Sequence, residues 1–448
     1  MPKLFGTDGI RGKFGYDLTE DLAEAVGASL VRLIKTLHTP KILIGMDTRE
    51  SSPILCRAIS HGIRAMGGDA VMLGVCSTPQ VAYLLQKHSF DAGVMISASH
   101  NPYQYNGIKI FGSSGFKLKD DEEEKIESDL FLCEMMDEFG HELQYDDGTK
   151  EYCEYLKSCF GTRLDGLRIG IDCANGSAVA TAKNIFPPLG AECYFLSDSP
   201  DGKNINLGCG STDASLLSEF VLKKRLDVGI AFDGDADRCI AVDECGREVD
   251  GDFIMAILSL RLKRLGILRK NTLVATLMSN MGLGVFCKEN GIDLVTVGVG
   301  DRQVLETMQN VGYSLGGEQS GHIIMRDVAS TGDGQLTALA LLSEIKESGK
   351  SLSALAACMK KYPQYNINIE ADENAKAIFR SSKEIQQTIA EAQRMISNLG
   401  RIVVRPSGTE ALIRIMAEGD ENVIKKLCDD LAKNISDILQ NSKSSVRE

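Results

Sequence analysis

Short β-rich runs alternate with helical stretches over residues 41–97. The β-rich runs are 41–45, 70–74 and 92–97. Ser52 and Thr78 each stand directly before a proline at the start of a helical stretch, where a hydroxyl residue caps a helix and proline is favoured at the first helical position. A glycine pair at 67–68 then ends the first helix. The pattern predicts a β-α-β-α-β unit with a parallel sheet.

The same order of elements returns twice further along the chain. Residues 167–196 and 272–298 each contain a buried strand, a polar Asn/Gly turn, a helix and another strand, which predicts two more α/β units. Residues 367–448 break the pattern, with strand-like runs beside long helices. The predicted fold is therefore α/β, with three related α/β domains that have mixed or parallel sheets and a smaller C-terminal α+β domain. The predicted boundaries are 1–150, 151–252, 253–366 and 367–448.

Composition narrows the classes of function. Hydrophobic residues make up 43% and charged residues 25% of the 448 residues, so each domain can bury a core. The net charge is −13 and no long run of Lys or Arg occurs, so nucleic acid is not an expected partner. Apolar stretches such as 253–260 fall far short of the ~20 residues that span a bilayer, so we expect no membrane segment and a cytoplasmic location. The 13 irregularly spaced cysteines predict reduced thiols rather than disulfides.

The segment ISASHNP (96–102) begins where a predicted strand ends. Ligand sites of doubly wound sheets lie at the carboxyl ends of strands, so this segment is well placed for chemistry. It offers Ser97, Ser99 and His100. At this point the residues leave two readings open, a reactive serine or a polar turn.

The segment AFDGDADRC (231–239) places Asp233, Asp235 and Asp237 at alternate positions after an apolar strand. Three close carboxylates repel one another unless a cation lies among them, and oxygen ligands suit Mg²⁺. An EF-hand is excluded because Arg238 stands where that loop needs glycine. A solvated acidic loop is the alternative. A divalent ion beside a serine turn favours phosphoryl transfer.

The segment RPSGTE (405–410) joins two strand-like runs. It combines Arg405 with the hydroxyls of Ser407 and Thr409, and Gly408 allows the backbone to approach a ligand closely. The segment is either a phosphate-binding turn or an ordinary hairpin turn.

The segment GGEQSGH (316–322) surrounds short polar side chains with glycines. Glu318, Ser320 and His322 suit the hydroxyl groups of a sugar, and a tight structural turn is the alternative. Near the N-terminus, Arg11 lies in the Gly-rich segment FGTDGIRG (5–12) and could bind a phosphate. Further along the chain, Lys109 could transfer a proton.

Five motifs in this order resemble the α-D-phosphohexomutase superfamily over nearly the whole chain. They are FGTDGIRG, ISASHNP, DGDADR, GGEQSGH and RPSGTE. Within the superfamily, SASHNP, GGEQSGH and NINLGCGSTD (204–213) are most similar to the branch that acts on glucosamine phosphates.

The resemblance implies a role for each candidate residue. Ser99 would carry the transferable phosphoryl group, while Ser97 shapes the site. One Mg²⁺ per chain would be held by the Ser99 phosphate and by Asp233, Asp235 and Asp237. Residues near the reacting group would be Arg11, Lys109 and Arg238, with Lys109 preferred over His100 as general base. Sugar contacts would come from Glu318, Ser320 and His322, and contacts to the phosphate that is not reacting would come from Arg405, Ser407, Gly408 and Thr409.

The implied activity is interconversion of glucosamine 6-phosphate and glucosamine 1-phosphate in a central cleft, through a phosphoserine and a bisphosphorylated sugar. Such an isomerase would feed amino-sugar nucleotide and cell-wall precursor synthesis. Alternatives are a mutase for glucose or mannose phosphates and a non-catalytic sugar-phosphate sensor. The intact Ser99 and the three aspartates argue against the sensor.

Three positions depart from the usual pattern of the superfamily. Met46 stands where a basic residue is common, Ser52 where glycine is common, and Ala411 where proline is usual. They remove no catalytic group and put only local loop geometry in question. The oligomeric state is left open, with a homodimer as one option.

Overall fold

The structure is a computed structural model that describes residues 4–6, 8–34, 36, 38–132, 139–396, 400–407 and 411–445. The chain divides into two compact units. The first unit comprises Met1–Ser279 and Cys287–Cys358, and the second comprises Asn280–Phe286 and Met359–Glu448.

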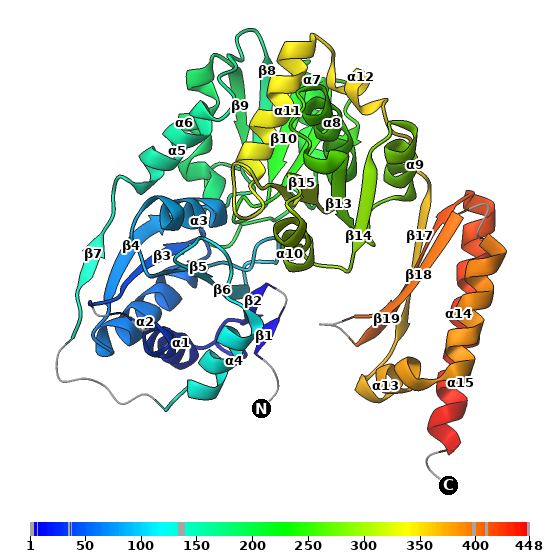
Figure 1. Cartoon of the computed structure of the whole chain (residues 1–448), viewed down its shortest axis with the longest axis horizontal. Helices are drawn as coiled ribbons and strands as arrows, with labels where there is room; N and C mark the ends of the chain where they lie inside the picture. The colour runs from blue at the N-terminus through cyan, green and yellow to red at the C-terminus, as the bar shows by residue number, and fades with distance from the viewer. Residues whose placement is uncertain are drawn as a thin grey trace. The chain divides into compact units, whose positions relative to one another are not determined.

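The first α/β segment has a mixed sheet (Figure 1). Its strands lie in the order β1 (Phe5–Gly6), β2 (Gly9–Lys13), β6 (Tyr105–Gly112), β5 (Ala92–Ile96), β3 (Lys41–Met46), β4 (Asp69–Val75) and β7 (Glu142–Gln144). The helices are α1 (Glu20–Leu33), α2 (Ser52–Ala65), α3 (Thr78–Lys87), α4 (Asp120–Asp129) and α5 (Gly148–Ser158). Strand β3 pairs in parallel with β4 and β5, as the alternating pattern predicts. Met46 and Ile96 are register partners, so the segments that follow β3 and β5 start side by side.

Both faces of this sheet are covered. Side chains alternate across a strand, so Ile42 and Ile44 of β3 join the core formed with α1, α2 and α4, whereas Leu43 joins the core formed with α3. Burial on both faces explains why the β-rich runs are almost continuously apolar.

The second α/β segment orders its strands β12 (Glu248–Val249), β11 (Cys239–Asp243), β10 (Val228–Phe232), β8 (Arg168–Asp172) and β9 (Glu192–Leu196). Its helices are η1 (Ser177–Ala180), α6 (Ala182–Ile185), η2 (Pro187–Leu189) and α7 (Ser215–Lys224). Strands β10 and β11 are antiparallel, with Phe232 opposite Cys239. The acidic loop 233–238 is therefore the connection of a hairpin whose two strands are fully buried.

The third α/β segment orders its strands β14 (Asp293–Val297), β13 (Thr272–Thr276), β15 (Leu315–Gly317) and β16 (Ile323–Met325). Its helices are α8 (Gly251–Arg264), η3 (Arg269–Asn271), α9 (Met281–Glu289), α10 (Asp301–Val311), α11 (Gly334–Ser348) and α12 (Leu352–Ala356). Strands β15 and β16 pair antiparallel with Gly317 opposite Ile323. The loop 318–322 is the turn between them.

The second unit contains an antiparallel sheet in the order β17 (Gln364–Glu370), β19 (Leu412–Gly419) and β18 (Gly400–Pro406). Its helices are α13 (Glu373–Ser381), α14 (Lys383–Ile396) and α15 (Glu421–Ser445). Figure 1 shows α14 and α15 running along this sheet, and their apolar residues share one core with the strands. Three α/β segments followed by an α+β segment confirm the predicted fold class.

The predicted helix caps Ser52 and Thr78 are wrong. The caps are the preceding residues, and Ser77 accepts a hydrogen bond from the Gln80 amide. Ser52 instead donates its hydroxyl to Asp47 at 2.6 Å, and Thr78 donates its hydroxyl to Asp235 at 2.6 Å. These buried carboxylates need donors, and that need decides where both hydroxyls point.

The structure bears on two expectations drawn from composition, the state of the cysteines and the presence of membrane-spanning helices. The cysteines among the described residues are all free thiols, and most of them are buried. Within the described part of the chain, none of the helices combines the length and apolar character needed to cross a membrane.

Candidate active site

Ser99 lies in a strained loop after β5. Its φ of 52° is in the left-handed region, which a residue with a side chain adopts only when its surroundings hold it there. The Ser99 amide donates to Ser97 Oγ at 2.9 Å. Its carbonyl oxygen accepts from Arg49 Nη2 at 2.8 Å and from Asn206 Nδ2 at 2.9 Å. Contacts on both sides of the residue thus fix the direction of its side chain.

The Ser99 hydroxyl points into the acidic loop. Its Oγ donates to Asp233 Oδ2 at 2.6 Å and lies 3.3 Å from His100 Nδ1. Burial and the charges of Arg238 and Arg11 lower the pKa of His100 to about 3, so this imidazole is neutral near pH 7. A neutral ring nitrogen beside the hydroxyl is able to accept its proton.

Asp233, Asp235 and Asp237 gather their carboxylates at one point. One oxygen from each lies within 4.8 Å of the others, and all three side chains are buried. Burial together with the charges of Asp237 and Asp235 raises the pKa of Asp233 well above its usual range. A Cβ on Gly234 would lie 2.5 Å from the Ser99 carbonyl oxygen, so glycine is what allows this loop to approach the serine.

The three aspartates fit a divalent cation. Among the described residues, Asp235 Oδ1 and Asp237 Oδ1 are buried without a hydrogen-bond partner. A buried carboxylate oxygen without a donor is unfavourable, and coordination of a hard cation would satisfy it. The structure thus brings together the three residues that the acidic motif predicts.

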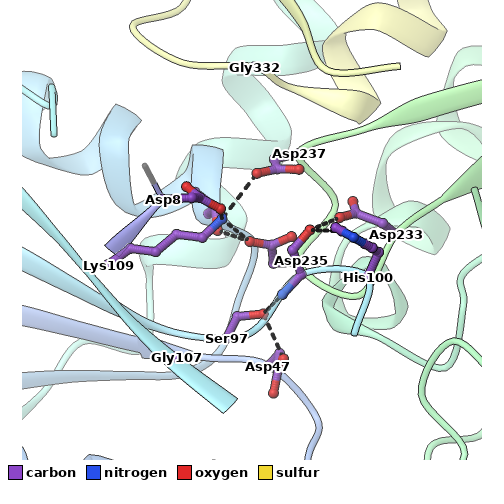
Figure 2. A network of polar contacts seen from close by, with 12 residues as sticks. Asp8, Asp47, Ser97, His100, Gly107, Lys109, Asp233, Asp235, Asp237 and Gly332 are labelled. Carbon is purple, nitrogen blue, oxygen red and sulfur yellow. Dashed lines mark hydrogen bonds and ion pairs between the residues drawn. The ribbon is translucent and has the colours of Figure 1, made fainter. Parts of the chain in front are cut away.

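Lys109 of β6 is nearly inaccessible and points into the same loop. Figure 2 shows its ammonium directed at Asp8, Asp235 and Asp237, with Nζ–Oδ2 distances of 3.2, 2.7 and 3.2 Å. Burial alone would lower the pKa of Lys109, but these carboxylates outweigh burial and hold the pKa well above its usual range. In this arrangement Lys109 is an ammonium and is able to give a proton.

Arg11 and Arg238 place two more cations at the site. Arg11 pairs with Asp8 and reaches Asn101 Oδ1 at 3.5 Å, while the Arg238 amide donates to Asp233 Oδ1 at 3.1 Å. The Nε groups of both arginines are buried and, within the described residues, lack a hydrogen-bond partner. These donors are available to an anionic ligand.

The turn between β15 and β16 presents the predicted sugar residues. Glu318 Oε1 accepts from the Gly300 amide at 3.3 Å, and Ser320 Oγ is buried with no hydrogen-bond partner in the described part of the chain. Both groups are able to bind further hydroxyls.

His322, from the same turn, is buried and faces the acidic loop rather than open space. Its Nδ1 lies 3.5 Å from Asp237 Oδ1. Burial lowers the pKa of His322, but Asp237 and Asp301 outweigh burial and raise it to about 9. The Gly332 amide, 3.1 Å from Nε2, instead favours a neutral ring. In the arrangement described, Nε2 accepts this hydrogen bond and Nδ1 is the ring nitrogen that faces Asp237.

The other predicted phosphate contacts lie in the second unit. Arg405 of β18 is the register partner of Arg414 of β19, and burial together with this neighbouring charge lowers the pKa of Arg405. Two guanidinium groups on facing positions repel each other, which favours an anion beside them. The Ser407 amide donates to the Leu412 carbonyl at 2.8 Å. Gly408 and Thr409 lie outside the described residues.

The motifs missed the residues that hold the serine loop. The side chain of Arg49 is fully buried and donates to Asp47, to the Ser99 carbonyl and to the Pro102 and Tyr105 carbonyls. Asp47 follows β3 directly, so the strand-end rule applied to ISASHNP would also have found it. Asn206 lies in the segment NINLGCGSTD (204–213), but the sequence assigned it no role, because its contact with Ser99 joins residues far apart in the chain.

Family models match the chain in four consecutive parts. They are described as phosphoglucomutase/phosphomannomutase, with alpha/beta/alpha domain I at residues 2–133, domain II at 150–246, domain III at 250–362 and the C-terminal domain at 367–434. The chain therefore belongs to the phosphoglucomutase/phosphomannomutase family, whose members are intramolecular phosphotransferases of the isomerase class.

Comparison with curated relatives shows to which branch of the family the chain belongs. The chain is 50% identical over 446 residues to a phosphoglucosamine mutase of Caldicellulosiruptor bescii, with 97% of this chain and 99% of that protein covered. It is 46% identical over 443 residues to a phosphoglucosamine mutase of Clostridium tetani, at 97% and 99% coverage. Within its family the chain thus belongs with the phosphoglucosamine mutases.

Solved structures share the fold. A phosphoglucomutase/phosphomannomutase family protein of Burkholderia thailandensis matches with a TM-score of 0.81 and 22% identity, over 97% of each chain. An N-acetylphosphoglucosamine mutase of Aspergillus fumigatus, solved with GlcNAc-6P and magnesium, matches with a TM-score of 0.66 and 18% identity, over 98% of this chain and 95% of that one.

Proposed function

We propose that this chain interconverts glucosamine 6-phosphate and glucosamine 1-phosphate, with Ser99 as the carrier of the phosphoryl group. The observation that carries the proposal is the Ser99 hydroxyl, held by a strained and fully bonded backbone 2.6 Å from Asp233 in the carboxylate cluster. A serine that served only as a polar turn would need neither the strain nor the buried carboxylates.

The proposed reaction is two phosphoryl transfers in opposite directions. In the first, the bond between phosphorus and Ser99 Oγ breaks while a hydroxyl oxygen of the sugar phosphate bonds to the same phosphorus, which gives a bisphosphorylated sugar. The hydroxyl proton passes to a base. Neutral His100 fits that role in the arrangement described, whereas Lys109 is an ammonium there and would serve as the base only after giving up its own proton. Ser99 Oγ takes up a proton as it leaves. In the second transfer, Ser99 Oγ gives up that proton and bonds to the other phosphorus of the turned sugar, while the bond between this phosphorus and its sugar oxygen breaks and the sugar oxygen takes up a proton. The enzyme ends in its starting form.

The residues around Ser99 would stabilise the negative charge of the phosphoryl group. Arg11 and Arg238 would face the phosphoryl oxygens, because their buried Nε groups have donors to offer. Asp233, Asp235 and Asp237, with the Ser99 phosphate, would hold one Mg²⁺, which when bound neutralises negative charge on the phosphoryl group.

Substrate binding is assigned to two turns. Glu318, Ser320 and His322 would face the sugar, and a carboxylate at Glu318 suits the ammonium group at C2 of glucosamine. The Arg405 turn would hold the phosphate that is not reacting. The four domain boundaries predicted from the sequence and a homodimeric state are also part of this proposal.

The test is an assay of the purified protein. Incubated with Mg²⁺ and a trace of bisphosphorylated sugar, the protein should convert glucosamine 1-phosphate into glucosamine 6-phosphate. We expect glucose 1-phosphate to react with kcat/KM lower by about 10–200-fold, because a pocket that only tolerates one substituent discriminates by ~1–3 kcal/mol. Faster turnover of glucose or mannose 1-phosphate would assign the chain to a hexose branch. Binding without turnover of any of them would identify a sensor.

A further inference from the structure

Six side chains form a closed ring in which acidic and basic residues alternate; Lys109, Asp237 and His322 are buried, and Asp8, Lys117 and Asp301 are mostly buried. In order they are Asp8, Lys117, Asp301, His322, Asp237 and Lys109. Asp8 pairs closely with Lys117, and the remaining contacts are Lys117–Asp301 at 2.6 Å, Asp301–His322 at 3.7 Å, His322–Asp237 at 3.5 Å, Asp237–Lys109 at 3.2 Å and Lys109–Asp8 at 3.2 Å. All three α/β segments contribute to the ring.

Lys117 and Asp301 are the members of this ring that the sequence analysis did not single out, either alone or within a motif, and Lys117 is the cation of the two. It follows the turn after β6, and its side chain is only 10% exposed. Its ammonium donates to Asp8 Oδ1 and to Asp301 Oδ2. Burial alone would lower the pKa of Lys117, but Asp301 and Asp8 outweigh burial and raise it, so the residue is an ammonium. Lys117 therefore joins the N-terminal loop of the first segment to the start of α10 in the third.

The two carboxylates that Lys117 neutralises also face the other two basic residues of the ring. Asp8 lies 3.2 Å from Lys109, and Asp301 lies 3.7 Å from His322. Without Lys117, Asp8 would attract the Lys109 ammonium more strongly and draw it away from Asp235. Asp301 would lose the partner that holds the start of α10, next to His322, against the first segment.

We propose that Lys117 is a positioning residue of the reaction, which pairs with Asp8 and Asp301 so that Lys109 and His322 stay directed at the Asp235–Asp237 loop. This inference rests on the proposed mutase function. Through Lys117, the turn that contains His322 and the acidic loop beside Ser99 belong to one set of contacts.

Arg302 supplies a matched control. It follows Asp301 directly and also joins α10 to the first segment, through Glu123 Oε1 at 2.5 Å and the Leu118 carbonyl at 3.2 Å. The hydrogen bonds and ion pairs that Arg302 makes in the described part of the chain go to Asp120, Glu123 and the Leu118 carbonyl, which lie outside the ring. A defect caused by loss of packing between the two segments should therefore appear in variants of Arg302 and Lys117 alike.

The experiment compares Lys117→Met, Lys117→Arg and Arg302→Met in the assay with glucosamine 1-phosphate. Misplacement of a reacting group by about 1 Å lowers rate by ~10²-fold, so we expect Lys117→Met to lower kcat about 10–100-fold and to change KM less than about 3-fold. Lys117→Arg should recover kcat to within about 5-fold of the wild type. Arg302→Met should keep kcat within about 3-fold.

A second variant guards against misfolding of Lys117→Met, in which Asp301 loses its nearest partner. The double variant Lys117→Met/Asp301→Asn carries no unpaired charge at Asp301, yet Asp8 remains free to draw Lys109, so its kcat should stay low while its melting temperature approaches that of the wild type. Wild-type kcat in the folded double variant would overturn the proposal. Equal losses in Arg302→Met and Lys117→Met would do the same. An inactive wild-type protein would overturn the mutase function itself, and with it this role.

Discussion

The Ser99 site and the Arg405 turn hold their polar groups in different ways. Around Ser99, side chains from three α/β segments contact one another in a mostly buried cluster. At the Arg405 turn, two arginines on neighbouring strands face each other across a simple antiparallel pair. In the proposed reaction, the first arrangement would stabilise charge that moves, and the second would offer a fixed positive charge to the phosphate that does not react. Substitutions in the first region should therefore act on kcat, and those in the second on KM.

The largest expected effect separates the two serines of ISASHNP. Ser99→Ala removes the oxygen that carries the phosphoryl group, so we expect activity to fall by about 10⁴-fold or more. Ser97→Ala removes a hydrogen bond to the Ser99 amide, and its activity should fall only about 10-fold. Peptide mass analysis of the wild-type protein should find phosphate on Ser99. Turnover that survives in Ser99→Ala would remove this residue from the mechanism.

The next effect concerns the carboxylate cluster. Asp235→Asn removes a charge from the metal-binding set, and we expect kcat to fall about 10²-fold, equivalent to about 2.7 kcal/mol of barrier. A chelator should abolish turnover of the wild type, and added Mg²⁺ should restore it. Asp243→Asn is the control, because Asp243 is a buried aspartate of the same hairpin that pairs with Arg247 instead. Full activity in excess chelator would contradict the metal assignment.

The smallest expected effect concerns Arg405, in the second of the two regions. Arg405→Ala removes one charge-assisted contact to phosphate, so we expect substrate binding to weaken by about 1.5–3 kcal/mol, seen as a KM raised about 10–100-fold with kcat little changed. Arg405→Lys keeps the charge and should be intermediate. Arg380→Ala, on the exposed side of α13, should leave KM unchanged. A collapse of kcat at constant KM would move Arg405 into the chemistry and erase the difference between the two regions.

The sequence predicted the elements and the centre of the site better than the contacts around it. Apolar runs followed by polar turns located β5 with Ser99 and β10 with Asp233, because the end of a strand is a local signal in the sequence. Patterns in neighbouring residues gave wrong predictions where the hydrogen-bond partner of a side chain lies in a distant segment of the sequence. The hydroxyls of Ser52 and Thr78 look like helix caps in sequence, and only the fold brings Asp47 and Asp235 to them.

The same reason explains the residues that were missed. Arg49, Asn206 and Lys117 each act through partners that lie in other parts of the fold, such as the Ser99 carbonyl or Asp301. No spacing rule connects residues that are 50, 107 or 184 positions apart. Patterns of single residue types identify sites that one loop supplies, such as the aspartates, more readily than sites assembled from several loops.

The double contact between Thr78 and Asp235 limits how the molecule can move. The Thr78 amide donates to the Asp235 carbonyl at 3.0 Å and its hydroxyl donates to the carboxylate of the same residue. Helix α3 of the first segment and the acidic loop of the second therefore behave as one rigid body at this junction. A hinge motion that separated them would break both hydrogen bonds and dismantle the cation site. In the proposed mechanism, an opening that lets the bisphosphorylated sugar turn around would keep these two hydrogen bonds and take place at another boundary of the chain.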